Sequence, residues 1–336
     1  MVASLVTTLR PAQAGGAQAF ICDLALGLGA RGHEVELYCA AGSEVAGVQM
    51  VPIEVGPEVR DALVMPGGRS AAPVAALAEG FSRLFRSLRA RGADVASIHA
   101  FDAEAYEPTG IRTLHTLHLP PLVPAVVAAA AAIRAPDGLV TVSEAMRRDW
   151  AAAGVSGVEV IRNGVPDFDP GTPERTRTAL IAGRISPEKG IEDALAAARL
   201  AGLPLEIVGD VYDAPYHAAR LGHLEITPAL SRPELWRRLA AVAVCVLPVQ
   251  WEEPFGLVAA EAQVMGCPVA GYRRGALPEV VEEGVGGYLA EPGDIDGLAR
   301  AIRACLLLDR SAVRASGRRR LLIERCVTEY EAMLSR

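Results

Sequence analysis

Apolar and polar positions along the first half of the chain alternate between two periods. Residues 2–7 are mostly apolar and predict a buried strand, whereas residues 18–30 carry apolar side chains every three or four positions and predict a helix. Residues 34–39 then predict a second strand. A strand, a helix and a strand in this order form a unit whose two strands lie parallel. Further strands are expected at 95–99, 112–118 and 138–142, and a further helix around 72–89.

The second half of the chain repeats this alternation after a turn-rich stretch at residues 163–173. The expected strands are 179–182, 205–208, 243–247 and 268–272, and the expected helices are 191–201, 231–240, 255–266, 278–283, 295–308 and 319–334. The pattern therefore predicts two α/β domains with a boundary near residues 165–173. In open sheets of this kind, ligands bind outside the carboxyl ends of the strands.

Composition agrees with two packed domains and excludes several other classes. The chain has 336 residues, of which 51% are apolar and 5% aromatic, so a disordered chain is excluded. A net charge of −7 argues against a nucleic-acid partner, because such binders carry a basic footprint. The six cysteines form no C-x-x-C pair, which favours buried thiols in a reducing cytoplasm over a structural metal site. The apolar run 119–133 is too short to span a membrane.

The segment from Glu253 to Glu261 carries the most informative chemistry. Two glutamates stand eight residues apart around Pro254 and Gly256, where a helix is expected to begin. Free backbone N–H groups at a helix N-terminus attract an anion, and a carboxylate one turn further on can accept hydrogen bonds from a sugar diol. The alternative is that both glutamates are solvated on an amphipathic helix.

Two loops that follow predicted strands add candidate ligand contacts. Arg184 and Lys189 lie in the loop 183–190, and such a pair of cations suits a diphosphate, although Arg184 could instead pair with Glu188. Gly15 and Gly16 follow the first predicted strand, and because glycine has no Cβ, the backbone there can approach a ligand closely. A plain tight turn explains the two glycines equally well.

These segments occur in the order seen in glycosyltransferase family 4, which the chain resembles over almost its whole length. The matching segments are Gly15-Gly16, Arg31-Gly32-His33-Glu34-Val35, Asn163-Gly164-Val165, 183–190, 253–261 and Gly287 onward. The resemblance implies the GT-B fold, in which two Rossmann-like domains with parallel sheets face a central cleft. It assigns residues 1–165 to the acceptor side and 166–318 to the nucleotide-sugar donor, with a C-terminal helix at about 319–336 packing back on the first domain.

The resemblance also implies a role for each matched residue. Arg184 and Lys189 would bind the donor diphosphate, Glu253 the hydroxyls of the transferred sugar, and Glu261 the ribose. The backbone at Phe255, Gly256 and Leu257 would touch the sugar and phosphates, and Gly15 and Gly16 would lie at the reaction centre. The expected catalytic group of the first domain is His118, with His115 as the competing frame and a buried structural histidine as the alternative for either.

The implied activity is a retaining transfer of a sugar from a nucleoside diphosphate to a hydroxyl acceptor, without a metal or other cofactor. Other functions remain open, namely a pseudo-glycosyltransferase or nucleotide-sugar epimerase on the same fold, and a non-catalytic nucleotide-sugar binding protein. Glu253 and Glu261 also admit an interpretation as a hydrolase acid and nucleophile, although their place beside an anion site speaks against it. The run 318–320 contains three arginines, and a solvated helix face is favoured there over contact with anionic lipid.

Overall fold

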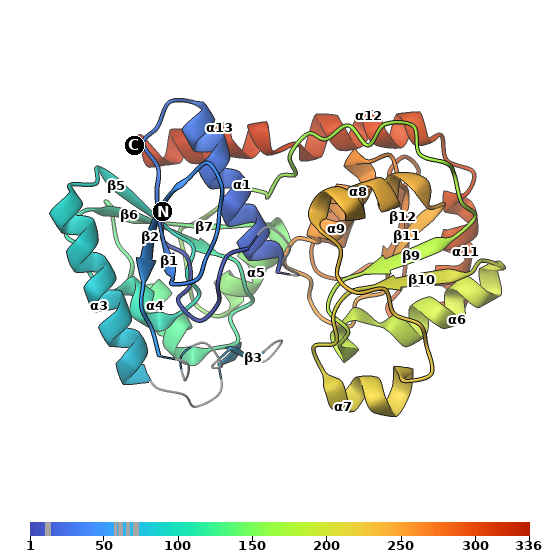
Figure 1. Cartoon of the computed structure of the whole chain (residues 1–336), viewed down its shortest axis with the longest axis horizontal. Helices are drawn as coiled ribbons and strands as arrows, with labels where there is room; N and C mark the ends of the chain where they lie inside the picture. The colour runs from blue at the N-terminus through green and yellow to red at the C-terminus, as the bar shows by residue number, and fades with distance from the viewer. Residues whose placement is uncertain (11–14, 57–58, 60–62, 65–67, 70–73) are drawn as a thin grey trace. The chain divides into compact units, whose positions relative to one another are not determined.

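The chain divides into two compact units in the computed structural model (Figure 1). The structure describes residues 1–10, 15–56, 59, 63–64, 68–69 and 74–336. One unit comprises Met1–Pro11, Ala17–Arg162 and Cys326–Arg336, and the other Ala12–Gly16 and Asn163–Arg325. The division after Arg162 lies close to the boundary predicted after residue 165. None of the described helices is both long enough and apolar enough to cross a membrane.

The first unit is built around a parallel sheet. Its elements are α1 (Gly16–Ala30), β1 (Glu36–Ala40), β2 (Gln49–Ile53), β3 (Leu63–Val64), β4 (Gly68–Arg69), α3 (Val74–Arg91), β5 (Val95–Ile98), the 3-10 helix η1 (Ala103–Tyr106), β6 (Arg112–Leu117), α4 (Pro124–Ala132), β7 (Gly138–Thr141), α5 (Glu144–Ala152) and β8 (Val158–Val160). Strands β5, β6, β7 and β8 pair in this order, and β1 pairs with β2. Of these, β2, β3, β4, η1, α4, α5 and β8 were not predicted from the sequence.

The predicted strand at residues 2–7 is wrong beyond its first residues. Only Val2 forms β-bridges, to Tyr38 of β1 and Ile98 of β5, and the chain bends from Leu5 onward. The Val2 N–H donates to the Ser97 carbonyl at 2.8 Å, and the Val2 carbonyl accepts from the His99 N–H at 2.7 Å. Burial of the whole segment explains the error, because apolar residues fill the core whether or not their backbone is extended.

Helices cover both faces of this sheet. Alternate residues of β1 point to opposite faces: Tyr38 joins a core with α3, whereas Leu37 and Cys39 join a core with α1. The C-terminal helix α13 (Ile323–Leu334) packs along α1, where a side chain at Gly27 would meet Val327 at 2.5 Å. The last residues of the chain therefore complete the first unit.

The second unit contains a five-stranded parallel sheet in the order β10-β9-β11-β12-β13. Its elements are β9 (Ala179–Ala182), the 3-10 helix η2 (Pro187–Lys189), α6 (Ile191–Ala201), β10 (Leu205–Val208), α7 (Ala214–Tyr216), the π-helix η3 (His217–Leu221), α8 (Arg232–Ala241), β11 (Val244–Leu247), α9 (Leu257–Val264), β12 (Val269–Tyr272), α10 (Leu277–Val280), β13 (Gly287–Ala290), α11 (Ile295–Cys305) and α12 (Arg310–Leu321). Helices α6 and α11 share a buried core with residues of β9, β11 and β12. The strand order reverses between β9 and β11, which is where such sheets bind ligands.

The single helix predicted over residues 319–334 is wrong. It is interrupted at Leu322, whose extended backbone (φ −70°, ψ 148°) separates α12 from α13. Leu322 forms a β-bridge with Val165 there, and the carbonyl of Leu321 accepts from the Val165 N–H at 2.8 Å. A side chain at Gly164 would lie 2.5 Å from the Cα of Ile323. The segment Asn163-Gly164-Val165 therefore has a structural role, since it pairs with the interruption between the two helices.

Candidate active site

The loop between β9 and α6 is fixed against the loop that follows β11. Gly190 ends η2 with φ +69°, and a side chain there would lie 2.0 Å from the Pro248 carbonyl oxygen. The backbone N–H of Gln250 donates to the Glu188 carbonyl at 2.8 Å. Only glycine allows both the left-handed backbone and this close approach. The loops that carry Lys189 and Glu253 are thereby held together at the point where the strand order reverses.

Lys189 and Glu253 form the centre of this site. The Lys189 ammonium lies 3.1 Å from Oε2 of Glu253, and the side chains are 20% and 15% exposed. The indole N–H of Trp251 donates to the same Oε2 at 2.8 Å, and the ammonium lies 5.5 Å from the Trp251 ring centroid. Two donors on one oxygen fix the carboxylate. Glu253 lies in the loop before the helix, as predicted from the sequence. The contact of Trp251 with Glu253 was not predicted.

Lys189 is also the one lysine of this chain. The sequence contains 33 Lys and Arg residues, and all the others are arginines. A compact ammonium and a planar guanidinium are not interchangeable where space and geometry are constrained. An ammonium has three N–H donors, so one can hold Glu253 while others meet a ligand oxygen.

Arg184 is held by its own loop. One Nη2 N–H donates to Oε1 of Glu188 at 3.1 Å, and the Ser186 hydroxyl donates to the same oxygen at 2.7 Å. The guanidinium lies 5.1 Å from the Tyr212 ring centroid. The ion pair left open as an alternative in the sequence therefore forms. Arg184 Nε and Glu188 Oε2 are buried without a hydrogen-bond partner among the described residues, which is uncommon for polar atoms in folded proteins.

Glu261 is buried and paired with a residue that sequence reasoning missed. Its side chain is 4% exposed, and Oε1 accepts from Nε of Arg232 at 3.0 Å. The Arg232 guanidinium in turn lies 4.7 Å from the Trp236 ring centroid. The alternative of a solvated glutamate is wrong for Glu261. No sequence spacing signals this pair, because Arg232 begins α8 and Glu261 lies in the middle of α9.

The N-terminus of α9 directly follows the loop that carries Glu253, and it is a candidate site for an anion. The helix begins at Leu257, two residues later than expected, and Gly256 precedes it with φ +86°. No side chain among the described residues caps this end. The Phe255 side chain is buried, so its ring belongs to the protein core and is not a ligand contact. The uncapped N–H groups and the helix dipole together favour negative charge.

The candidate residues near the N-terminus and around β6 lie in different surroundings. Gly15 precedes α1 and Gly16 begins it, next to residues 11–14, which lie outside the described residues. His118 directly follows β6, whereas His115 lies within β6 and stacks on Tyr106 with ring centroids 4.5 Å apart. Both histidines are buried. The structure therefore places His118, and not His115, at the carboxyl end of a strand.

His118 is part of a hydrogen-bonded row of buried polar groups. Its Nε2 lies 3.0 Å from Nδ1 of His99, and Nε2 of His99 lies 2.9 Å from the Ser97 hydroxyl. Burial lowers the pKa of His118 to about 3, and burial also holds the pKa of His99 well below its usual value. Both rings are therefore neutral at physiological pH. Because Nε2 is occupied, Nδ1 is the ring nitrogen that remains for a ligand of His118.

Comparison with known proteins assigns the chain to a family. The family described as Glycosyltransferase Family 4 matches residues 14–167, and the family described as Glycosyl transferases group 1 matches residues 167–320. Together the two matches take in all the candidate site residues. The chain belongs to glycosyltransferase family 4 and has the GT-B fold, so the predicted α/β class is confirmed.

Individual relatives are more distant. Glycogen synthase from Mycobacterium tuberculosis (strain ATCC 25618 / H37Rv) is 34% identical in an alignment 224 residues long, and the match covers 59% of this chain and 52% of that protein. D-inositol 3-phosphate glycosyltransferase from Mycobacterium marinum is 33% identical over 202 residues, 53% of this chain and 42% of that protein. The chain thus spans about half the length of these curated relatives. Anabaena HepE, solved with UDP and glucose, is 20% identical with a TM-score of 0.73 over 99% of each chain.

Proposed function

We propose that this protein is a retaining glycosyltransferase that moves a sugar from a nucleoside diphosphate to a hydroxyl group of an acceptor. One observation carries the proposal. Lys189 and Glu253 are 64 positions apart in the chain, but their side chains form an ion pair of 3.1 Å in the loops that follow β9 and β11. The loop of Lys189 also carries Arg184, and the loop of Glu253 leads into the uncapped N-terminus of α9. Residues that match the family motifs thus gather at the strand ends where α/β sheets bind ligands.

The proposed roles follow from the chemistry of each group. Lys189 and Arg184 neutralise the diphosphate, and the N-terminus of α9 stabilises the charge that develops as it leaves. Oε2 of Glu253 is occupied by Lys189 and Trp251, so Oε1 is the oxygen offered to sugar hydroxyls. Glu261, whose Oε1 is held by Arg232, is proposed to accept from the ribose. The reaction needs no metal in this scheme.

Transfer with retention then proceeds on one face of the sugar. The bond from the anomeric carbon to the diphosphate oxygen breaks, and a bond to the acceptor oxygen forms on the same side. The acceptor proton passes to the departing diphosphate. His118 is neutral, so its proposed part is a hydrogen bond from or to the sugar and not the transfer of a positive charge.

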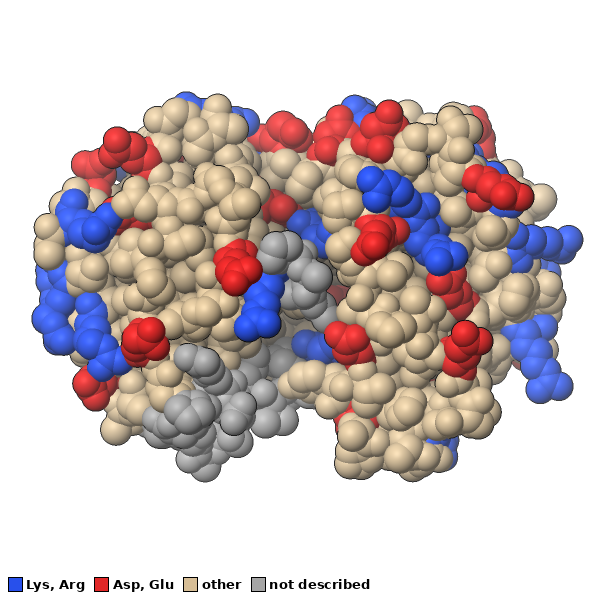
Figure 2. All heavy atoms as spheres, viewed as in Figure 1, with Lys and Arg blue, Asp and Glu red and all other residues tan. Residues whose placement is uncertain are grey.

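A cytoplasmic location is part of the proposal. The six cysteines, all within the described residues, form no disulfide, as expected for a reducing compartment. Basic and acidic side chains are interspersed on the visible face of each unit (Figure 2), and a nucleic acid is not among the proposed partners.

The single lysine offers a direct test of donor binding. Reductive methylation with ¹³C-formaldehyde labels Lys189 and the N-terminal amine and keeps both charges, and a Lys189→Arg variant assigns the lysine signal. UDP, GDP, ADP and TDP are added in turn, beginning with UDP because HepE was solved with it. We expect one of them to shift the Lys189 signal. No response to any of the four would contradict the diphosphate role of Lys189.

Glu253→Gln separates transfer from binding. We expect the rate of transfer to fall at least about 100-fold, while the affinity for the nucleoside diphosphate changes less than about threefold. A variant that transfers at full rate would refute the assignment. The anomeric configuration of the product, read by NMR, tests retention, and loss of activity with a chelator would contradict the metal-free scheme.

A further inference from the structure

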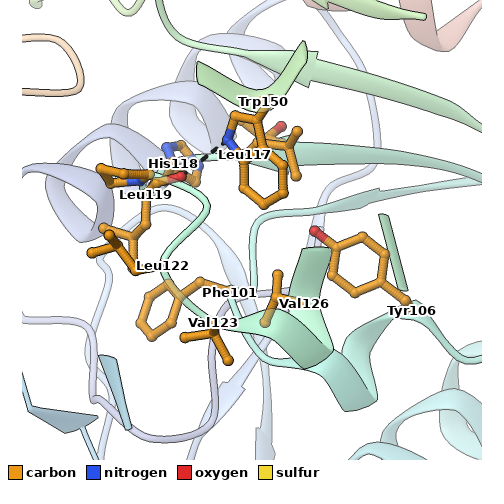
Figure 3. A pocket seen from close by; sticks show the side chains of 11 residues that line it. Phe101, Tyr106, Leu117, His118, Leu119, Leu122, Val123, Val126 and Trp150 are labelled. Carbon is orange, nitrogen blue, oxygen red and sulfur yellow. Dashed lines mark hydrogen bonds between the residues drawn. The ribbon is translucent and has the colours of Figure 1, made fainter. Parts of the chain in front are cut away.

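A hollow in the first unit lies directly beside His118. It is lined by eleven residues and is open to solvent on one side (Figure 3). Trp150 of α5 lies on one side, and Phe101 and Val123 lie on the other. The remaining lining residues are Tyr106, Thr116, Leu117, His118, Leu119, Pro120, Leu122 and Val126.

The polar side chains of this hollow are almost all satisfied within the protein. The Trp150 indole N–H donates to the Leu119 carbonyl at 3.1 Å. The Thr116 hydroxyl shares a hydrogen bond of 3.0 Å with the hydroxyl of Tyr330. His118 uses Nε2 for His99. A polar ligand group that entered here would lose its water and gain few partners, which costs free energy, whereas an apolar group would not.

Tyr106 provides a polar contact in addition to Nδ1 of His118. Its hydroxyl points into the hollow, and it forms no hydrogen bond with another described residue (Figure 3). Its ring is fixed by stacking on His115. A largely apolar lining with a small number of convergent polar groups is the usual composition of a small-molecule pocket.

We infer that this hollow binds an apolar group, an alkyl chain or an aromatic ring, that the acceptor carries next to the hydroxyl group to be glycosylated. The inference rests on the proposed function, because it places the accepting hydroxyl beside His118. It names the chemical class of acceptor, namely an alcohol or glycoside with an apolar substituent and not a bare hydrophilic sugar.

Two glycosides that differ only in their apolar part test the inference without any donor. Hexyl β-D-glucopyranoside and methyl β-D-glucopyranoside are titrated into the ¹⁵N-labelled protein, and the three indole N–H signals are followed. Hexyl glucoside is expected to shift the Trp150 signal, to leave the Trp236 signal of the second unit in place, and to bind at least about tenfold more tightly, as burial of about two methylene groups predicts. Equal affinity for the two probes, or an unmoved Trp150 signal, would overturn the inference.

Variants at the mouth of the hollow supply the control. Leu122 is 52% exposed, so Leu122→Asn is expected to fold and to weaken binding of hexyl glucoside at least about fivefold. Leu307 is 88% exposed in the second unit, so Leu307→Asn is the matched change and is expected to leave binding unaltered. Equal effects of the two substitutions would contradict the inference.

The two proposals fail separately. If hexyl glucoside binds at Trp150 while Lys189 responds to no nucleoside diphosphate, the pocket stands and the proposed function fails. If Lys189 responds and the hexyl group is ignored, the proposed function stands and the apolar acceptor is refuted.

Discussion

In both units the candidate ligand residues follow strands of a parallel sheet, but the residues are charged and paired in one unit and uncharged in the other. The second unit holds three cations against three carboxylates, in the pairs Arg184–Glu188, Lys189–Glu253 and Arg232–Glu261. The first unit instead buries neutral imidazoles beside an apolar hollow. One backbone architecture therefore supports an ionic site and an uncharged one, and the loops after the strands decide which.

This contrast changes how an acidic chain is expected to bind a diphosphate. With a net charge of −7 and each site cation facing a carboxylate, the ligand-free second unit presents little excess positive charge at the site. A diphosphate must therefore share Lys189 with Glu253. Such sharing couples the group proposed for the diphosphate to the group proposed for the sugar.

Breaking the buried pair of the second unit is expected to have the largest effect. Arg232→Met leaves the carboxylate of Glu261 buried without its cation, which should cost about 3–5 kcal/mol of the free energy of unfolding. Urea denaturation measures this loss. Replacing both residues, in Arg232→Met/Glu261→Met, should recover most of the stability. If the single variant is as stable as the parent, the pair does not hold Glu261 as described.

Acid should destabilise the first unit through its histidines. Burial lowers the pKa of His115 to about 4 and of His118 to about 3, and that of His99 also lies well below its usual value. Since the folded rings stay neutral while the unfolded ones take up protons below about pH 6.5, stability is full above that pH and falls as pH decreases. Between pH 7 and 5.5 the loss should be about 1.2 kcal/mol for each ring, or about 4 kcal/mol for three.

The measurement is urea denaturation at the two pH values, with His115→Gln as the variant. Removing one titrating ring should reduce the loss by about 1.2 kcal/mol. An unchanged pH dependence in the variant would show that His115 is not neutral in the folded state.

Removing one of the two N–H groups that donate to Glu253 should have a smaller effect, which is limited to the rate of sugar transfer. Trp251→Phe keeps the aromatic ring but deletes the N–H that bonds Oε2, so transfer should slow about tenfold while affinity for the nucleoside diphosphate stays within about twofold. Tyr272→Phe is the matched control, because it deletes a hydroxyl that donates to Asp193 at 2.7 Å in the same unit. Equal slowing in both variants would mean that Trp251 acts only through stability.

Exposed ion pairs of the second unit should contribute least. Arg319 is 66% exposed, and its Nη2 lies 3.8 Å from Glu282. Arg319→Ala should change the free energy of unfolding by no more than about 0.5 kcal/mol, again by urea denaturation. A larger loss of stability would contradict the expectation that ion pairs at the surface contribute less to folding than the less exposed pairs of the candidate site.

Local patterns predicted several elements of the second unit well, because their apolar positions follow a strand or helix period and glycines lie at their ends. Residues 179–182, 191–201 and 205–208 have the predicted bounds of β9, α6 and β10. Glycines at 183, 190 and 202 mark where these elements end. The first unit was harder, since residues 2–7 have the composition of a strand but only Val2 pairs with its neighbours.

The candidate site shows the same division between local and distant information. Spacing and helix boundaries made Lys189, Glu253 and Gly256 candidates without the structure. Nothing in the sequence indicated that Arg232 would reach Glu261 or that His99 would bond His118, because these partners come from different elements. Trp251 stands only two residues before Glu253, but its contact depends on the turn between them.

The sequence by itself determined the α/β class, the alternation of strands and helices, and the family motifs, because periodicity and turn residues act over a few positions of the chain. Tertiary structure decided the state of the charges. It paired Arg184, Lys189 and Arg232 with carboxylates, and it made His118 neutral by burying it. Ion pairing and desolvation depend on which elements meet in space, and that information is not contained in any local stretch of residues.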